Sequence, residues 1–476
     1  MTDINHSTAS ALKPEPPYVR RRSSVARVGQ TAIGGDNPVR VQSMTTTNTN
    51  DTEACVAQAK RIIAAGGELV RLTTQGTREA ENMANISAQL KAEGIMTPLV
   101  ADVHFNPAVA DVAATCCEKV RINPGNYVDP ARTFKKLSYD DAEYADEVRK
   151  IEARLLPFLD ICKLHHTAVR IGVNHGSLSD RIMSRFGDTP EGIVESCMEF
   201  LRVCRKADFT DVVLSVKASN TVVMVRSVRL LVEAMDREDM HFPLHLGVTE
   251  AGEGEDGRVR SAVGIGALLT EGLGDTIRVS LSEEPECEIP VARKLVSFIP
   301  ECASLRRTAP IEDGVMRLSL DEDDAEDLML KAAMAAGAPL IDGRATDLVV
   351  TNKGVEQPRL ADSILQAARV RFTHTEFISC PGCGRTLYDL QGTIARIKAA
   401  VSEAAASLPR LNTLKIAIMG CIVNGPGEMA DADYGYVGAA RHKVSLYRGK
   451  VCVEKNIPEE EAVERLLQLI REDGEA

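Results

Sequence analysis

The stretch ELVRLTT, residues 68–74, is a short β-rich run that ends in polar residues, and its pattern recurs along the first part of the chain. The segment before it repeats apolar residues from Cys55 to Ile63 at the spacing of one helix face, and Gly66 and Gly67 end that helix. Eight such runs occur, most of them followed by a helical stretch. They span residues 39–46, 68–74, 98–104, 119–123, 168–174, 211–217, 243–250 and 275–282.

Eight strand–helix units predict an α/β fold of the (β/α)8 TIM-barrel type rather than a doubly wound sheet. In such barrels the chemistry takes place where the strands end. The ends of these runs are rich in basic and polar residues: Arg71, Asp102, His104, Arg121, Asn123, Arg170, Asn174, Lys217, His245, Glu250, Arg278 and Ser280. Like charges brought together need an anion, and guanidinium groups match phosphate with paired hydrogen bonds. The sequence therefore predicts a site for a phosphorylated small molecule at the barrel mouth.

The charge and hydropathy of the 476-residue chain narrow the class of protein. Lys and Arg number 56 and Asp and Glu 68, a net charge of −12, so a generic nucleic-acid-binding protein is not expected. No apolar run approaches the ~18–20 residues of a transmembrane helix. Arg20, Arg21 and Arg22 are not followed by the apolar region of an export signal, so we expect a cytoplasmic protein.

The segment GEGEDG, residues 252–257, matches the G-x-G-x-x-G pattern of dinucleotide-binding loops. Its acidic residues Glu253, Glu255 and Asp256 do not suit a pyrophosphate, and no dinucleotide-binding strand–helix unit surrounds it. We interpret it as a flexible loop after the seventh strand.

Residues 302–371 differ from the barrel segment before them. A strand-like run at residues 314–320 is followed by the acidic block 321–327, which is typical of a helix start because carboxylates favour the positive end of the helix dipole. We predict a flexible N-terminus (1–25), a TIM-barrel substrate-binding domain (26–301), an insert or linker of unassigned role (302–371), and a smaller α+β iron–sulfur domain (372–476).

Twelve cysteines in a reducing compartment do not indicate disulfides, and those in helical segments, such as Cys55 and Cys197, fit a buried core. Three others differ. Cys380 and Cys383 form Cys-Pro-Gly-Cys, and Cys421 lies in a glycine-rich turn after the apolar run 414–419. Three thiolates with backbone amides close to the sulfurs suit a 4Fe–4S cluster, with Glu428 as the nearest further ligand, while a zinc site or structural thiols remain alternatives.

Nine motifs of the chain closely resemble the 4-hydroxy-3-methylbut-2-en-1-yl diphosphate synthase family of the methylerythritol phosphate isoprenoid pathway. They are VQSMTTTNTND, RLTTQG, ADVHF, RINPGN, RIGVNHGSL, GVTEAGEGEDG, DTIRVSLS, SCPGCGR and MGCIVNGPGE. The resemblance covers about residues 25–301 and 372–450. The long segment 127–166 is similar to the plant and chlamydial type, whose extra domain between barrel and cluster domain corresponds here to a shortened insert.

The resemblance implies reductive opening and dehydration of 2-C-methyl-D-erythritol 2,4-cyclodiphosphate to (E)-4-hydroxy-3-methylbut-2-enyl diphosphate. It implies one 4Fe–4S cluster on Cys380, Cys383, Cys421 and Glu428, with Glu428 exchangeable for substrate oxygen and Glu250 near the substrate hydroxyls as a proton donor. The implied substrate-binding residues are Arg71, His104, Arg121, Asn123, Arg170, Asn174, Lys217, Arg278 and Ser280.

No flavin or nicotinamide fingerprint is visible, so the electrons are expected from a ferredoxin or flavodoxin. The resemblance also implies a homodimer, in which a cluster domain covers either its own barrel or that of its partner. Two alternative functions remain at this stage. A pterin-type transferase would leave the three-cysteine domain without a role, and a non-catalytic iron–sulfur carrier would leave the cations of the barrel mouth unexplained.

Overall fold

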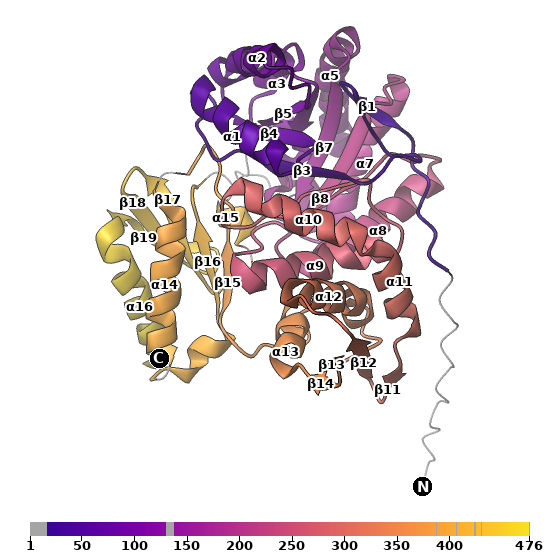
Figure 1. Cartoon of the computed structure of the whole chain (residues 1–476). Helices are drawn as coiled ribbons and strands as arrows, with labels where there is room; N and C mark the ends of the chain where they lie inside the picture. The colour runs from indigo at the N-terminus through magenta and orange to yellow at the C-terminus, as the bar shows by residue number, and fades with distance from the viewer. Residues whose placement is uncertain are drawn as a thin grey trace.

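The computed structural model describes residues 17–129, 138–386, 388–405, 407–422, 425–429 and 431–475. Within these ranges the chain forms a barrel, a smaller layer attached to it, and a C-terminal sheet domain (Figure 1). The predicted flexible terminus lies partly outside the described residues, at residues 1–16. Arg20, Ser23 and Ser24 are already bonded to the barrel, two of them to Asp275 and one to the backbone of His241, so the part joined to the barrel begins before residue 26.

The eight predicted strand runs form one parallel sheet that closes into a barrel, which confirms the predicted fold class. The strands are β3 (Arg40–Met44), β4 (Leu69–Thr74), β5 (Leu99–Val103), β6 (Lys119–Ile122), β7 (Ala168–Asn174), β8 (Val212–Lys217), β9 (His245–Leu246) and β10 (Thr276–Ile277). Their order is β8-β7-β6-β5-β4-β3-β10-β9, and a parallel bridge between Leu214 and Leu244 joins the two ends. All eight strands therefore end at the same mouth.

Helices between the strands cover the outside of the barrel (Figure 1). They are α1 (Thr52–Ala64), α2 (Thr77–Ala92), α3 (Pro107–Ala114), α4 (Pro124–Tyr127), α5 (Asp141–His165), α6 (Asp180–Phe186), α7 (Pro190–Lys206), α8 (Thr221–Arg237), α9 (Gly254–Thr270), α10 (Glu288–Ser297) and α11 (Ile299–Thr308), with short 3-10 turns at His175–Ser177 and Pro285–Cys287. Side-chain caps start several of them, for example Asp51 at α1 and Asn220 at α8. The hairpin of β1 (Ala26–Val28) and β2 (Thr31–Ile33) packs on the apolar residues at the opposite end of the barrel.

The segment GEGEDG is not the flexible loop predicted for it. Gly254 begins α9, and Glu255 and Asp256 lie in its first turn. The carboxylate of Glu283 accepts a hydrogen bond from the backbone N–H of Gly254 at 2.8 Å and pairs with Arg258, one turn further along. A tertiary contact therefore holds the start of this helix, which the local glycine content does not indicate.

Residues 309–368, within the segment 302–371 predicted as an insert or linker, form a compact layer on the barrel. The strands β11 (Ile311–Glu312), β12 (Val315–Leu320), β13 (Asp347–Asn352) and β14 (Val355–Glu356) make one sheet, with β12 and β13 parallel. The acidic block begins α12 (Ala325–Ile341), as predicted, with Asp324 as its cap, and α13 (Pro358–Ala367) follows the sheet. The buried side chains of α12 belong to the same apolar core as the barrel helices.

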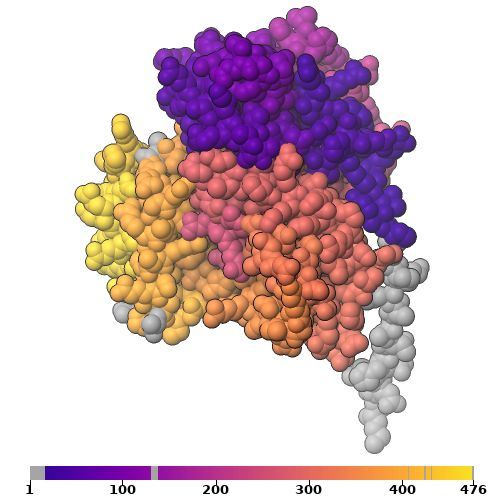
Figure 2. Space-filling view, in the orientation of Figure 1, coloured from indigo at the N-terminus to yellow at the C-terminus, as the bar shows by residue number. Residues whose placement is uncertain are grey.

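The C-terminal part is a mixed sheet with two long helices. Its strands β15 (Glu376–Ser379), β16 (Lys415–Met419), β17 (Tyr434–Ala440), β18 (Lys443–Arg448) and β19 (Val451–Pro458) pair in that order, the first three parallel and the rest antiparallel. The helices are α14 (Leu390–Ala405), α15 (Gly425–Glu428) and α16 (Glu459–Glu475), with a 3-10 turn at Pro409–Thr413. Figure 2 shows this domain packed against the flank formed by the barrel and the added layer.

The C-terminal domain covers the mouth of its own barrel. Ala251 and Ser379 form a bridge between the two parts, and Gly176 and Gly427 approach so closely that a Cβ built on Gly176 would lie 2.1 Å from the carbonyl carbon of Gly427. Only glycine at both positions permits this contact. None of the helices that the structure describes is long and apolar enough to cross a membrane.

We predict that Gly337→Ile destabilises the chain, because Gly337 on α12 packs directly on α9. A Cβ at Gly337 would lie 2.6 Å from the backbone oxygen of Val263, so a branched side chain forces the helices apart. Overpacking of this kind costs about 1–3 kcal/mol of unfolding free energy. Denaturant unfolding would measure it, with Gly76→Ala as the control because no atom lies within 4 Å of a Cβ built at Gly76. Equal midpoints for the two variants would show that α12 does not depend on close contact with the barrel.

Candidate active site

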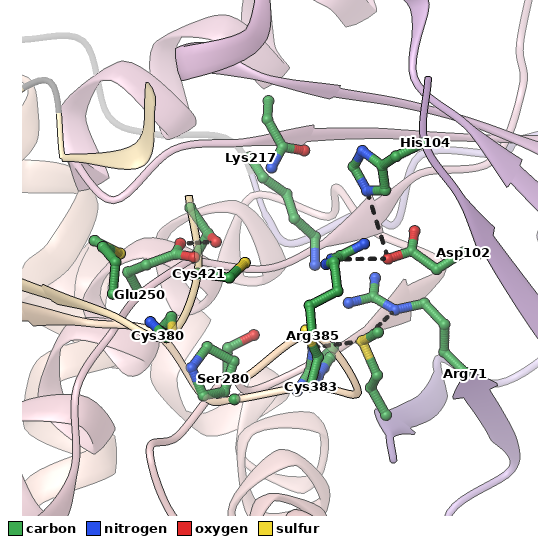
Figure 3. A pocket seen from close by; sticks show the side chains of 18 of the residues that line it. Arg71, Asp102, His104, Lys217, Glu250, Ser280, Cys380, Cys383, Arg385 and Cys421 are labelled. Carbon is green, nitrogen blue, oxygen red and sulfur yellow. Dashed lines mark hydrogen bonds and ion pairs between the residues drawn. The ribbon is translucent and has the colours of Figure 1, made fainter. Parts of the chain in front are cut away.

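A cavity lies between the barrel mouth and the C-terminal domain. The barrel side contributes Met44, Arg71, Asp102, His104, Arg121, Arg170, Asn174, Lys217, Thr249, Glu250, Arg278 and Ser280. The C-terminal side contributes Cys380, Pro381, Gly382, Cys383, Arg385, Met419, Gly420, Cys421 and Gly425. Figure 3 shows the labelled side chains of both groups pointing into one space. The structure thus brings together most of the site residues predicted from the sequence.

Five cationic side chains from five strands are buried around the barrel side of this cavity: Arg71, Arg121, Arg170, Lys217 and Arg278. Strand register explains the convergence, because Asp102 is level with Arg121 on the next strand, and Arg121 is level with Arg170 on the strand after that. Burial and the neighbouring cations lower the pKa of Arg170 and of Lys217 well below their ordinary values. The cationic side chains at the barrel mouth therefore outnumber the carboxylates that pair with them there.

Asp102 is the carboxylate nearest the centre of this group. Its Oδ1 accepts a hydrogen bond from Nη1 of Arg121 at 3.1 Å, and its Oδ2 lies 3.6 Å from Nε2 of His104. Nη2 of Arg170 and Nη2 of Arg385 each lie 4.0 Å from the same carboxylate. Burial alone would raise the pKa of Asp102, but the surrounding cations hold it well below its usual value. One carboxylate thus faces several guanidinium groups and satisfies only one of them fully.

Several donors at the mouth have no acceptor among the described residues. Nε and Nη1 of Arg170, Nε of Arg121 and Nδ1 of His104 are buried without a hydrogen-bond partner there. Arg170 is only 1 % exposed. Unsatisfied buried donors are costly, and a ligand with several anionic oxygens would satisfy them. Burial and the charge of Arg121 lower the pKa of His104 to about 3, so this imidazole is neutral.

Arg278 differs from the other cations because it already has a carboxylate partner. Its Nη2 and Nε lie 2.8 and 3.0 Å from the two carboxylate oxygens of Glu288, at the start of α10. This two-point contact fixes the guanidinium at the edge of the cavity, beside Ser280. Arg278 can still meet an anion, but with fewer of its five N–H donors available than Arg170 has.

The structure does not place Asn123 in the lining of the cavity. β6 ends at Ile122, and Asn123 caps the short helix α4 by accepting a hydrogen bond from the backbone N–H of Gly125 at 3.1 Å. Its Nδ2 donates to the hydroxyl of Ser177 at 2.8 Å. Its amide is therefore occupied within the barrel loops, and its role in binding substrate remains a prediction from the resemblance alone.

Glu428 lies behind the cavity wall, fully buried on α15. Its Oε1 accepts a hydrogen bond from Nδ2 of Asn174, and its Oε2 has no partner among the described residues. Asn174 also accepts a hydrogen bond from Nη2 of Arg121 at 2.8 Å, so a chain of contacts links the carboxylate to the cations. Burial raises the pKa of Glu428, opposed by the hydrogen bond from Asn174. An unpartnered buried carboxylate oxygen is the kind of atom that ligates a metal.

The three predicted thiols lie at the carboxyl ends of two neighbouring parallel strands. Cys380 and Cys383 follow β15, Cys421 follows β16, and all three line the cavity. The Sγ of Cys380 accepts a hydrogen bond from the backbone N–H of Gly420 at 3.2 Å. No three His, Cys, Asp or Glu side chains of the described ranges converge on a point that would hold a single metal ion.

Glu250 has a backbone conformation that is unusual for a residue other than glycine. Its φ is +51°, in the left-handed region, and Arg260 supports the turn by donating to the backbone oxygens of Glu250 and Ala251 at 3.3 and 3.0 Å. The carboxylate contacts the hydroxyl of Thr249 and faces the cavity. Burial, and then the nearby carboxylate of Glu428, raises the pKa of Glu250 well above its usual value, which favours the protonated carboxyl group.

Arg385 lines the cavity but was not predicted from the sequence, and Asp102, named among the strand-end residues, was not assigned to the substrate-binding set. A signal was available for each. Asp102 stands two residues before His104 on the same run, and alternate residues of a strand face the same side. Arg385 follows the Cys-Pro-Gly-Cys motif by two residues, within one of the motifs that carry the resemblance.

Comparison with known proteins places this geometry in context. Residues 23–293 match the family model described as the GcpE TIM-barrel domain, and residues 376–472 match the GcpE protein C-terminal domain. A 4-hydroxy-3-methylbut-2-en-1-yl diphosphate synthase (flavodoxin) of Bacteroides thetaiotaomicron is 51 % identical over 609 aligned residues, covering 96 % of this chain and 98 % of the relative. One of the same name from Bacteroides fragilis is 50 % identical over 611, with 96 % of each covered. Both alignments exceed the 476 residues of this chain, so each relative carries segments that it lacks.

We predict that Arg170→Gln weakens binding of inorganic pyrophosphate. Among the barrel cations of the cavity, Arg170 has the most donors without an acceptor in the described residues, and a charge-assisted hydrogen bond is worth about 1.5–3 kcal/mol, or roughly 10- to 150-fold in Kd. Calorimetric titration measures the change. Arg149→Gln, on the solvent side of α5, is the control and should bind as the unaltered protein does. An Arg170→Gln variant with unaltered affinity would show that the mouth does not bind diphosphate through this side chain.

Proposed function

The chain belongs to the GcpE family, and we propose that it is a 4-hydroxy-3-methylbut-2-en-1-yl diphosphate synthase that converts 2-C-methyl-D-erythritol 2,4-cyclodiphosphate to (E)-4-hydroxy-3-methylbut-2-enyl diphosphate. The conversion consumes two electrons and two protons, opens the cyclic diphosphate and releases one water. The observation that carries the proposal is the shared cavity, in which buried cations that lack acceptors face three thiols.

We propose that the thiols of Cys380, Cys383 and Cys421 hold one 4Fe–4S cluster and that Glu428 provides its fourth ligand. The cluster would supply the two electrons and a Lewis-acidic iron on the side of the cavity that faces the barrel. The arrangement of the donors supports this assignment. The thiols lie around the cavity, and Oε2 of Glu428 is buried and unpartnered among the described residues. Carboxylate is a weaker ligand of iron than thiolate, so a substrate oxygen could displace it.

The barrel cations would bind the diphosphate and so orient the carbon skeleton toward the C-terminal domain. Arg71, Arg121, Arg170 and Lys217 would carry most of the charge compensation, since Arg278 already shares Glu288. Neutral His104, together with Asn174 and Ser280, would add hydrogen bonds without further charge. These contacts would orient the substrate and would not take part in breaking its bonds. They would hold the reacting carbon at a fixed distance from the electron source.

Glu250 would deliver a proton to the substrate. The carboxyl group is buried and lines the cavity together with the cations and the thiols, and its raised pKa favours the protonated form that a proton donor needs. The left-handed turn at Glu250, held by Arg260, fixes the direction of this side chain. The proton would pass to the oxygen that leaves as water, so the departing group is neutral.

The electron donor is proposed to be a flavodoxin, as in the names of the two Bacteroides relatives, with a ferredoxin as the alternative from the resemblance. A homodimer and a cytoplasmic location remain predictions. The C-terminal domain meets the barrel of the same chain, so a second subunit is not required to complete the cavity. An iron–sulfur carrier without catalytic activity would leave the unsatisfied cations of the mouth without a purpose.

The proposal predicts a cluster and an activity that are lost together when a thiol is removed. After anaerobic reconstitution, the protein should contain four irons and four sulfides per chain and turn over the cyclic diphosphate with reduced flavodoxin. Cys380→Ser, Cys383→Ser and Cys421→Ser should each lose the visible absorbance of the cluster and the turnover, because each removes an iron–thiolate bond.

Cys117→Ala is the matched control, because Cys117 is buried in the barrel core with its Sγ near the backbone oxygen of Ala113. It should keep the cluster and the rate. A full cluster in Cys421→Ser, or a reconstituted protein that leaves the cyclic diphosphate unchanged, would contradict the proposal.

Glu428→Gln should separate cluster assembly from turnover. The three thiolates still hold the cluster, but the amide is a poorer ligand of iron, so the EPR signal should change and the rate fall by about 10- to 100-fold. Glu454→Gln, a surface carboxylate of the same domain paired with Arg465, should leave both unchanged. An unaltered EPR signal and an unaltered rate in Glu428→Gln would exclude Glu428 as a ligand.

A further inference from the structure

Arg385 is the one cationic side chain that the C-terminal domain contributes to the described lining of the cavity. It lies in the loop after β15, two residues beyond Cys383, and its side chain is 7 % exposed. Figure 3 shows Arg385 extending from this loop toward Asp102 of the barrel. The side chain therefore crosses from one domain into the mouth of the other.

The guanidinium of Arg385 is poorly satisfied where it lies. Nε and Nη1 are buried and have no acceptor among the described residues, and Nη2 is 4.0 Å from Oδ2 of Asp102, too far for a hydrogen bond. Asp102 is already engaged with Arg121 and His104. The sulfur of Cys383 accepts a hydrogen bond from the guanidinium and that of Cys421 also acts on its charge, but sulfur is a weak acceptor. An arginine this deeply buried normally has its fork of donors filled.

The charge of Arg385 adds to the excess on the barrel side. Arg385, His104 and Arg121 line the same cavity, and the charge of Arg385 lowers the pKa of the other two groups. Two guanidinium groups brought together from different domains repel each other unless an anion lies between them. A diphosphate offers several charged oxygens in a compact volume, and it would turn this repulsion into attraction from both sides.

We propose that Arg385 is a diphosphate-binding residue, so that the anionic ligand is bound jointly by the barrel and the C-terminal domain. The proposal rests on the proposed function, which places a cyclic diphosphate in this cavity. Arg385 would contact the diphosphate from the face opposite the barrel strands, with Nε and Nη1 as donors. A lysine would supply the charge but not the forked pair of donors.

Calorimetric titration of the oxidised holoprotein without reductant measures this binding in the absence of turnover. Arg385→Gln should raise the Kd for the cyclic diphosphate and for inorganic pyrophosphate by a similar factor, about tenfold or more. This is the effect expected from the loss of one charge-assisted hydrogen bond. Arg385→Lys should recover part of the loss. Arg396→Gln, an exposed arginine of α14 in the same domain, is the matched control and should bind both ligands normally.

The outcomes separate this inference from the proposed function. If the unaltered protein does not bind the cyclic diphosphate, the proposed function fails. If the unaltered protein binds the cyclic diphosphate and Arg385→Gln binds it equally well, only the proposed role of Arg385 fails. If the affinity is unaltered but the cluster spectrum changes, Arg385 interacts with the sulfur of Cys383 instead. Should Arg385→Gln not retain its cluster, the same titration is made on cluster-free Arg385→Gln and cluster-free unaltered protein, and equal Kd values would overturn the proposal.

Discussion

Positive charge buried around a single carboxylate is the constraint on which the rest of this molecule depends. Asp102 lies within 4.0 Å of Arg121, Arg170 and Arg385, and only Arg121 makes a true hydrogen bond to it. A closed parallel barrel is a rigid way to hold such groups together, because strand register, and not side-chain attraction, fixes their positions. An anion with several oxygens in the mouth would offset the remaining cost of keeping these cations out of water.

The C-terminal domain adds reactive groups to the anion-binding groups of the barrel mouth. It brings thiols to the side of the cavity opposite the cations, and its contacts with the barrel are made within one chain. The link from Arg121 through Asn174 to Glu428 connects the anion-binding groups to the proposed iron ligand by hydrogen bonds. Under the proposed function, the bound diphosphate and the fourth iron ligand would therefore lie next to each other.

The sequence predicted the barrel and most of its lining because both depend on short-range patterns. Alternation places strand-end residues on one side, and eight repeats imply closure. The sequence was less informative where contacts between distant segments determine the position of a residue. The side chain of Asn123 caps the helix α4 instead of facing the cavity. A pattern of polar residues at strand ends does not show such a local hydrogen bond. Gly254 begins a helix because Glu283, distant in sequence, binds its N–H. Arg385 belongs to the cavity only through the way the C-terminal domain docks, which no periodicity encodes.

Anomalous X-ray diffraction at the iron edge, from crystals of anaerobically reconstituted protein soaked with the cyclic diphosphate, tests the central claim most directly. We expect four irons next to Cys380, Cys383, Cys421 and Glu428. The diphosphate should lie between these irons and the side chains of Arg71, Arg121 and Arg170. Iron bound at other residues, or a diphosphate outside the barrel mouth, would contradict it.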